Sequence, residues 1–193
     1  MSALRHLPLA LTALRALLAP VVVLLALAWP NPAAFGVCLV AAFLSDVFDG
    51  IVARRLGIAT PGLRRLDSIA DSLFYVAALV AAWHLQPQAL LEHRAALMLL
   101  VLLELTRYAF DLRKFGREAS YHMWSSKLWG IALFAGFFSL LALGRSGWAV
   151  TAAIWLGIVA DLEGLAISVV LTRWMNDVPS IVHAWRLRAP ERS

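Results

Sequence analysis

Long apolar runs, separated by short polar segments, follow one another along most of the chain. Each run reaches roughly the 20 residues that a helix needs to cross a bilayer. Helices are the expected spanning form, because a single chain must satisfy its own backbone hydrogen bonds in hydrocarbon. We therefore predict an all-α integral membrane protein with six transmembrane helices, forming one domain over residues 1–193. The predicted spans cover about residues 8–29, 33–55, 64–84, 89–112, 121–143 and 147–173.

The first apolar run shares features with a secretory signal peptide, since Arg5 and His6 precede it. The run from Leu7 to Trp29 is nevertheless too long for the apolar region of such a peptide, and it contains Arg15. We therefore expect it to be retained as the first span.

Composition agrees with this interpretation. Of the 193 residues, 62% are hydrophobic and 15% are charged, whereas soluble domains are about half apolar and a quarter charged. Cys38 is the single cysteine, which excludes an intrachain disulfide and a cysteine-based metal site. The net charge of +5 comes from basic residues near span ends. We therefore expect anionic membrane lipids rather than nucleic acid as partners.

The basic residues also predict an orientation. With the N-terminus inside, only Arg94 and Arg145 among the residues flanking the spans fall outside. An excess of Lys and Arg marks cytoplasmic segments. We therefore predict a multi-pass protein of the cell's inner (plasma) membrane with both termini cytoplasmic. The basic residues assigned to the cytoplasmic side are Arg5, Arg54, Arg55, Arg64, Arg65, Arg113, Lys114, Arg117, Arg173, Arg186, Arg188 and Arg192.

The second predicted span carries an acidic pair near its cytoplasmic end. At about 100° per residue, Asp46 and Asp49 lie on one stripe of the helix. Gly50 and Ala53 fall on the same stripe, and Arg54 lies beside it. The small residues leave the stripe bare, so that a bulky phosphate or nucleotide could approach the backbone. Arg54 would offer a planar fork to phosphate oxygens.

The third predicted span carries a second acidic pair, Asp67 and Asp71, which are four residues apart and share a face. Because the two spans run antiparallel through a short loop, both pairs should meet at the cytoplasmic end. Carboxylates inside a membrane are costly and usually face a functional cavity. Hard oxygen ligands suit Mg²⁺, Mn²⁺ or Ca²⁺, and four of them could hold two divalent ions for a displacement at phosphorus. The alternative is that these aspartates only pair with the flanking arginines.

The stretches "DVFDGIVAR" (46–54) and "DSIAD" (67–71) carry a family resemblance. They are similar to the signature of the CDP-alcohol phosphotransferase (CDP-alcohol phosphatidyltransferase) family, which is DxxDGxxAR, eight residues, then GxxxDxxxD. Seven of the eight specified positions match, and Leu63 stands where the family has its second glycine. The N-terminal "PLALTALRALLAP" (8–20) resembles the PNxLTxxR opening of the phosphatidylglycerophosphate-synthase-like branch, with Leu9 in place of the usual Asn.

The resemblance implies an activity and the residues that would perform it. It implies that a CDP-linked lipid, typically CDP-diacylglycerol, binds Mg²⁺ or Mn²⁺ through its pyrophosphate. An alcohol acceptor attacks the lipid-side phosphorus and CMP leaves, at a site facing the cytoplasm. Members of the family are often homodimers, and we expect the same here. Carried onto this chain, the implied roles are metal binding by Asp46, Asp49, Asp67 and Asp71, general base catalysis by Asp71, and CDP binding by Gly50, Ala53 and Arg54.

Arg107 on the fourth span and Lys127 on the fifth are candidates for binding a phosphorylated acceptor. The alternative for Arg107 is an ion-pair ladder with Glu104 and Asp111, which share its helix face. Arg15 either reaches the cavity or extends to the cytoplasmic surface. Asp161, near the middle of the sixth span, either pairs with Lys127 or Arg107 or marks an interruption of that helix.

Three functional hypotheses remain open. The favoured one is a phosphatidyltransferase that uses glycerol 3-phosphate as acceptor, with inositol phosphate, serine or another alcohol as alternatives. A membrane prenyltransferase also uses aspartate-rich motifs, but it needs more spans than 193 residues allow. A divalent-cation carrier would place acidic residues along a path through the membrane, whereas here they gather at one end.

Overall fold

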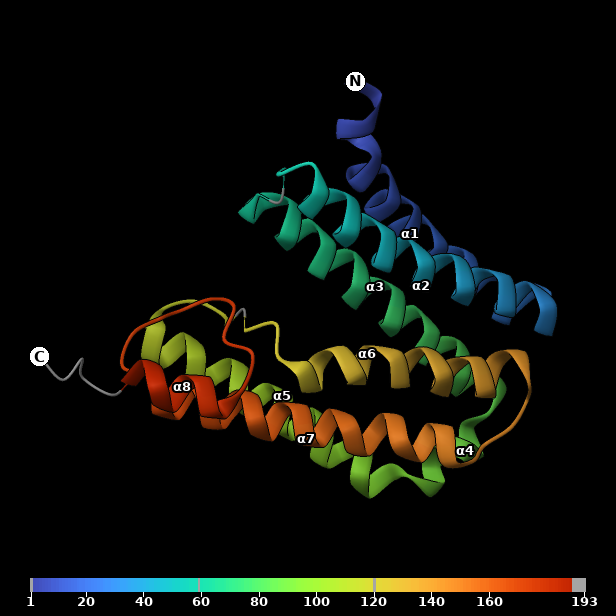
Figure 1. The fold of residues 1–193 in the computed structure, drawn as a ribbon. Helices are drawn as coiled ribbons and strands as arrows, with labels where there is room; N and C mark the ends of the chain where they lie inside the picture. Colours follow the sequence, from blue (N-terminus) through green and yellow to red (C-terminus); the bar gives the residue numbers. More distant parts are fainter. Residues whose placement is uncertain (1, 59, 120, 189–193) are drawn as a thin grey trace, which may run out of the picture. The chain divides into compact units, whose positions relative to one another are not determined.

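The computed structural model describes residues 2–58, 60–119 and 121–188, and their regular structure is helical, as predicted (Figure 1). The chain divides into two compact units. The first comprises Met1–Leu90 and Phe137–Ser146, and the second comprises Leu91–Gly136 and Gly147–Ser193.

The first unit is built from three long helices, α1 (Ser2–Ala28), α2 (Pro32–Arg55) and α3 (Pro61–Leu85). The starts of α2 and α3 follow from their sequences. Asn31 and Thr60 cap the two helices by accepting bonds from the backbone N–H groups of Ala34 (3.1 Å) and Leu63 (3.2 Å). A proline follows each cap at the first helical position, where its missing N–H costs nothing.

Helix α1 packs extensively against both α2 and α3, whereas α2 and α3 contact each other much less. On α3, alanines recur at spacings of three and four residues and are almost fully buried, which allows close approach of the helices. They are Ala70, Ala77, Ala78, Ala81 and Ala82. As a result, a side chain from α1 can lie between the polar faces of α2 and α3.

A short π-helix, η1 (Phe138–Ala142), completes the first unit and packs against α2. A π-helix leaves the regular hydrogen-bond ladder. Here the side-chain amide of Gln86 donates to the carbonyl oxygen of Leu140 at 2.8 Å. Gly36 of α2 leaves room for the Phe138 ring, which would lie 3.5 Å from a Cβ at that position.

The second unit contains α5 (Arg94–Phe115), most of α6 (Trp124–Phe137), α7 (Trp148–Val170) and α8 (Ile181–Arg188). Helices α5 and α7 pack together, and α8 packs on α7. Gly157 of α7 is required by this packing, because a Cβ there would lie 2.7 Å from Nε1 of Trp129 and 2.8 Å from Cδ1 of Leu100. At one end, Tyr121, Met123 and Val178 form a buried cluster with residues of α7 and α8.

Two predicted spans differ from the structure. The helix expected over 89–112 is interrupted at His93, which separates the short α4 (Pro87–Glu92) from α5. The span expected over 121–143 begins at Trp124 and changes from α6 to η1 at Phe138. By contrast, α7 is continuous through Asp161, so the interpretation of this residue as a helix break is wrong.

Among the described residues, five helical segments are long and apolar enough to cross a membrane. Helix α5 is long enough, with 22 residues, but Glu104, Arg107 and Asp111 interrupt its apolar character. Its role as a sixth span remains a prediction, as does the orientation of the termini. The five segments are His6–Ala28, Pro32–Arg55, Arg65–Leu85, Trp124–Ala142 and Trp148–Val170.

Candidate active site

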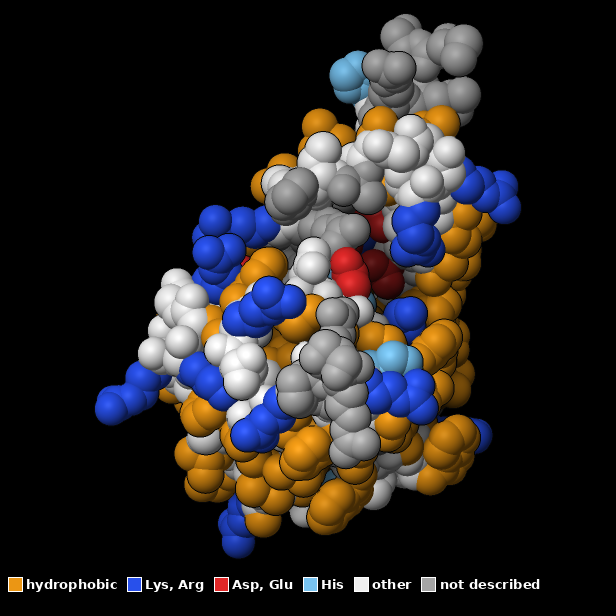
Figure 2. Space-filling model, turned by 60° about the vertical axis from the view of Figure 1, so that its left-hand side comes forward, with side chains coloured by type: hydrophobic (Ala, Val, Ile, Leu, Met, Phe, Trp, Pro, Cys, Tyr) orange, Lys and Arg blue, Asp and Glu red, His pale blue; other side chains and the backbone are white. Residues whose placement is uncertain are grey.

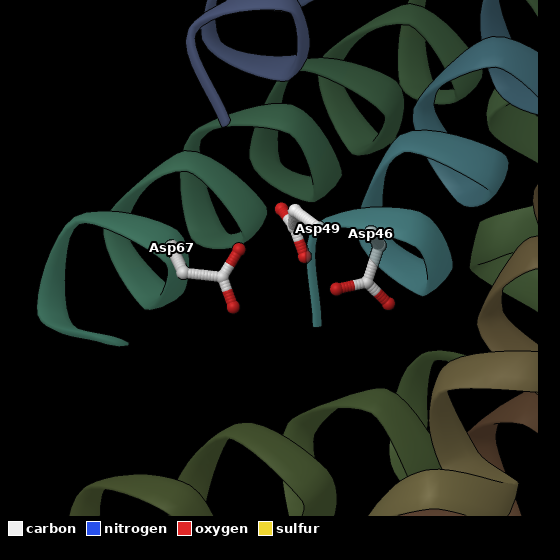
Figure 3. A group of neighbouring side chains, drawn as sticks. All are labelled: Asp46, Asp49 and Asp67. Carbon is white, nitrogen blue, oxygen red and sulfur yellow. The ribbon is translucent and has the colours of Figure 1, made fainter. Parts of the chain in front are cut away.

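Three of the predicted metal ligands come together in the first unit. Asp46 and Asp49 project from α2 and Asp67 projects from α3, with their carboxylates turned toward one another (Figure 3). One oxygen from each carboxylate lies within 4.8 Å of the other two. The spacing of three residues on α2 therefore places both acids on the face that meets α3, as the helical geometry requires.

Arg15 of α1 reaches the centre of this group. Its Nη1 lies 3.0 Å from Oδ1 of Asp67 and 3.3 Å from Oδ1 of Asp46. Its Nη2 lies 2.5 Å from Oδ2 of Asp49. Nη1 also donates to Oδ1 of Asp71, which brings the fourth predicted ligand to the same guanidinium. We call Arg15 and these four aspartates the carboxylate cluster.

Neutral polar groups complete the buried side of the carboxylate cluster. Arg15 Nε donates to Oγ of Ser45 at 3.5 Å. The Thr12 hydroxyl lies 3.4 Å from Oδ2 of Asp49 and 3.1 Å from the carbonyl oxygen of Pro8, one turn earlier. These contacts fix the Arg15 side chain inside the bundle. The alternative in which Arg15 extends to the membrane surface is therefore wrong.

Exposure is uneven across the carboxylate cluster. The Arg15 and Asp49 side chains are 1% and 5% exposed, whereas Asp46 is 46% exposed. Asp67 and Asp71 are about one-third exposed. The cluster is thus closed toward α1 and open on the opposite side. On the face shown in Figure 2, Asp and Glu side chains are rare among large hydrophobic areas.

The predicted nucleotide-binding residues lie one turn farther along α2. A Cβ on Gly50 would lie 3.2 Å from Nη1 of Arg54, so the arginine side chain covers this bare position. Arg54 itself is exposed, and Ala53 is buried. The nearest atoms to this position thus belong to a flexible side chain, and the CDP-binding roles remain predictions.

The second unit holds a separate group of charges. Arg107 of α5 binds Asp161 of α7 through Nε at 3.1 Å, and Glu104 of its own helix through Nη2 at 2.7 Å. Arg107 also crosses Gly164, where a Cβ would lie 2.9 Å from its Cδ. Of the two partners considered for Asp161, Arg107 is thus confirmed. Lys127 is exposed, and its Nζ lies 4.4 Å from the centre of the Trp124 ring.

The donor set of the carboxylate cluster fits a hard divalent cation. Carboxylate oxygens are the ligands that Mg²⁺ and Mn²⁺ prefer, and Asp46, Asp49 and Asp67 offer three of them at close range. With all four aspartates ionised, the guanidinium of Arg15 offsets one of their four negative charges, and bound divalent cations would offset more of them.

Fold and site together define an all-α membrane protein with a carboxylate cluster suited to binding cations. The family model for CDP-alcohol phosphatidyltransferases matches residues 5–162. The chain therefore belongs to the CDP-alcohol phosphatidyltransferase family, as the motif resemblance predicted. A search of curated proteins and a search of solved structures each gave no match.

Family membership settles the general chemistry. The family transfers a phosphatidyl group from a CDP-linked donor to an alcohol acceptor and is generally dependent on divalent metal. The protein is accordingly a transferase of the membrane. The matched residues include the whole carboxylate cluster as well as Arg107 and Asp161.

Proposed function

We propose that the protein transfers the phosphatidyl group of CDP-diacylglycerol to a small alcohol, glycerol 3-phosphate in the first instance, and releases CMP. The observation that carries this proposal is the convergence of Asp46, Asp49 and Asp67 from two helices. The resemblance of the N-terminal segment favours glycerol 3-phosphate over inositol phosphate or serine.

The four aspartates of the carboxylate cluster would hold two divalent ions, Mg²⁺ or Mn²⁺. When bound, such ions neutralise charge on the pyrophosphate and on the oxygens of the displacement at phosphorus. Asp46, Asp49 and Asp67 would supply most ligands. This assignment is supported by their mutual distances and by the open side of the cluster near Asp46.

Asp71 would accept the proton of the attacking hydroxyl. Its side chain is 33% exposed, so that an acceptor could approach it. A positioned carboxylate within hydrogen-bond reach is a suitable general base. The same residue could also bind a metal ion through its second oxygen.

Gly50, Ala53 and Arg54 would border the CDP moiety, with Arg54 moving from Gly50 toward the phosphates. Arg107 and Lys127 would bind the phosphate of the acceptor. The exposed ammonium of Lys127 supports this role. For Arg107, an anionic acceptor would have to displace Glu104, the more exposed of its two partners.

We further propose that α5 forms a sixth span, that both termini and the active site face the cytoplasm of the inner membrane, and that the protein forms a homodimer. The pairing of Arg107 with Asp161 supports a membrane position for α5, because intramembrane charges pair within the helix bundle.

The test is CMP release from CDP-diacylglycerol by the purified protein, with Mg²⁺ or Mn²⁺ and a panel of alcohols. The lipid product is identified by its mass. Phosphatidylglycerophosphate as the main product would support the full proposal. A different phosphatidyl product would correct the acceptor. Divalent-ion flux through proteoliposomes without CMP release would instead support a carrier.

A further inference from the structure

One side chain, Arg15, bonds to every aspartate of the carboxylate cluster. Its guanidinium bonds directly to oxygens of Asp46, Asp49 and Asp67, which are also the proposed metal ligands. Arg15 comes from a third helix, α1, and its side chain is only 1% exposed. The guanidinium of Arg15 therefore lies among the carboxylate oxygens that are proposed to bind a metal cation.

The physical reason lies in the cost of buried charge. Carboxylates that leave water without a counter-charge repel one another and lose hydration. The fork of an arginine can donate to several oxygens at once. Because α1 packs on both α2 and α3, a cation on α1 can hold the acidic faces of these two helices together.

We propose that Arg15 is a resident counter-cation that orders the four aspartates in the metal-free protein and exchanges with the divalent ions when these bind. The inference rests on the proposed metal site. It makes Arg15 a positioning residue that competes for the ligand oxygens, because an oxygen lone pair that accepts from the guanidinium is not available to a metal ion.

Two features of the cluster allow this exchange. The Asp46 side chain is 46% exposed, so an ion can reach its carboxylate from solvent, whereas Arg15 is 1% exposed. On the closed side, the Nε–H group of Arg15 donates to Ser45 Oγ. Arg15 therefore keeps a neutral partner after its Nη atoms have released the carboxylates.

The experiment compares Arg15→Gln and Arg15→Lys with wild type, using the full chain in detergent. Arg145→Gln, a change at an exposed arginine of the same unit, is the matched control. Melting temperature is measured in chelator, and Mn²⁺ affinity is measured from the electron paramagnetic resonance signal of free Mn²⁺. Neither measurement requires turnover.

For Arg15→Gln we expect a melting temperature in chelator lower by about 5–15 °C, because buried carboxylates lose their partner. We also expect Mn²⁺ to bind about tenfold more tightly or better, because a repelling charge near the ligands is removed. Arg15→Lys retains the charge and should fall between wild type and Arg15→Gln in both measurements. Arg145→Gln should match wild type.

Weaker Mn²⁺ binding in both Arg15 variants would overturn the exchange and show that Arg15 assists metal binding. An unchanged melting temperature in chelator would overturn its role as counter-cation. If Arg15→Gln does not fold, Arg15→Lys decides through the same two readouts. Failure of wild type and variants alike to bind Mn²⁺ would overturn the metal site and the exchange together, whereas CMP release would still test the transferase activity.

Discussion

Two arginines, Arg15 in one unit and the partly buried Arg107 in the other, organise the charges of this protein in different ways. Arg15 is surrounded by four aspartates from two other helices. Arg107 has two acidic partners, Glu104 on its own helix and Asp161 on α7. Both arginines join helices through ion pairs, yet the balance of charge around them differs.

The two groups differ in net charge: the Arg15 group has a large excess of negative charge, whereas the charges of the Arg107 group nearly cancel. With all partners ionised, the Arg15 group carries three negative charges in excess, and the Arg107 group carries one. An excess of three is difficult to sustain in a membrane without further cations. An excess of one is removed when the two carboxyl groups share a single proton. We therefore expect substitutions of the aspartates in the first group to act on catalysis and those in the second group to act largely on stability.

The largest effect is expected for Asp71→Asn. Loss of a general base lowers turnover by about 10²–10⁴-fold. The protein should remain folded, because the amide still accepts a hydrogen bond from Arg15. The measurement is CMP release in matched membranes. Asp177→Asn serves as control, because Asn tolerates the positive φ of 55° at this exposed position. Normal turnover of Asp71→Asn would remove Asp71 from the mechanism.

The second prediction tests whether Arg107 also binds substrate. Arg107→Gln leaves Asp161 buried without its partner and should destabilise the protein by about 3–5 kcal/mol. The double variant with Asp161→Asn should recover much of this loss, because the buried Asp161 position no longer carries a charge and the Glu104 side chain is 45% exposed. Chemical denaturation measures both effects.

Steady-state kinetics of the double variant Arg107→Gln with Asp161→Asn then distinguish acceptor binding by Arg107 from a purely structural role. If Arg107 binds an acceptor phosphate, KM for glycerol 3-phosphate should stay raised by about tenfold or more, since a charged hydrogen bond contributes about 1.5–3 kcal/mol. Lys127→Gln should raise the same KM without loss of stability, because Lys127 is exposed. An unchanged KM in both variants would remove these residues from acceptor binding and leave Arg107 with a structural role only.

Comparison of the two groups also shows what the sequence could reveal. The acidic pairs of α2 and α3 were predictable, because their spacings of three and four residues determine a shared helix face whatever the tertiary packing. The position of Arg15 was not, because α1 is apolar on nearly all sides and its pattern does not show which face turns inward. Likewise, no Gly or Pro marks the break at His93, and nothing near Asp161 in the sequence decides between Arg107 and Lys127 as its partner.

The third prediction concerns the packing of α7 against α5 and α6 at Gly157. Gly157→Ala should destabilise the protein by about 1–3 kcal/mol, because the added Cβ collides with Trp129 and Leu100 and overpacks the interface. Gly130→Ala on α6 is the control, since a Cβ there meets nothing within 4 Å. Alanine is the better helix former, so this control should be neutral or stabilising by up to about 1 kcal/mol. Equal melting temperatures for the two variants would contradict this packing.

The smallest effect is expected at Glu163, a charged residue of α7 that the motif does not explain. Its Oε1 accepts the backbone N–H of Ile181 at 3.2 Å and so caps the start of α8. Glu163→Gln retains an acceptor but loses the charge that favours a helix N-terminus, which costs about 0.3–1 kcal/mol. Glu163→Ala removes the cap as well and should cost about 0.5–2 kcal/mol. The rate of hydrogen exchange at the backbone amides of α8 should rise from wild type to Glu163→Gln and further to Glu163→Ala. Turnover should stay near wild type in both variants. A large loss of turnover in Glu163→Gln would instead place the residue in the chemistry, because the loss of a helix cap is expected to act on stability.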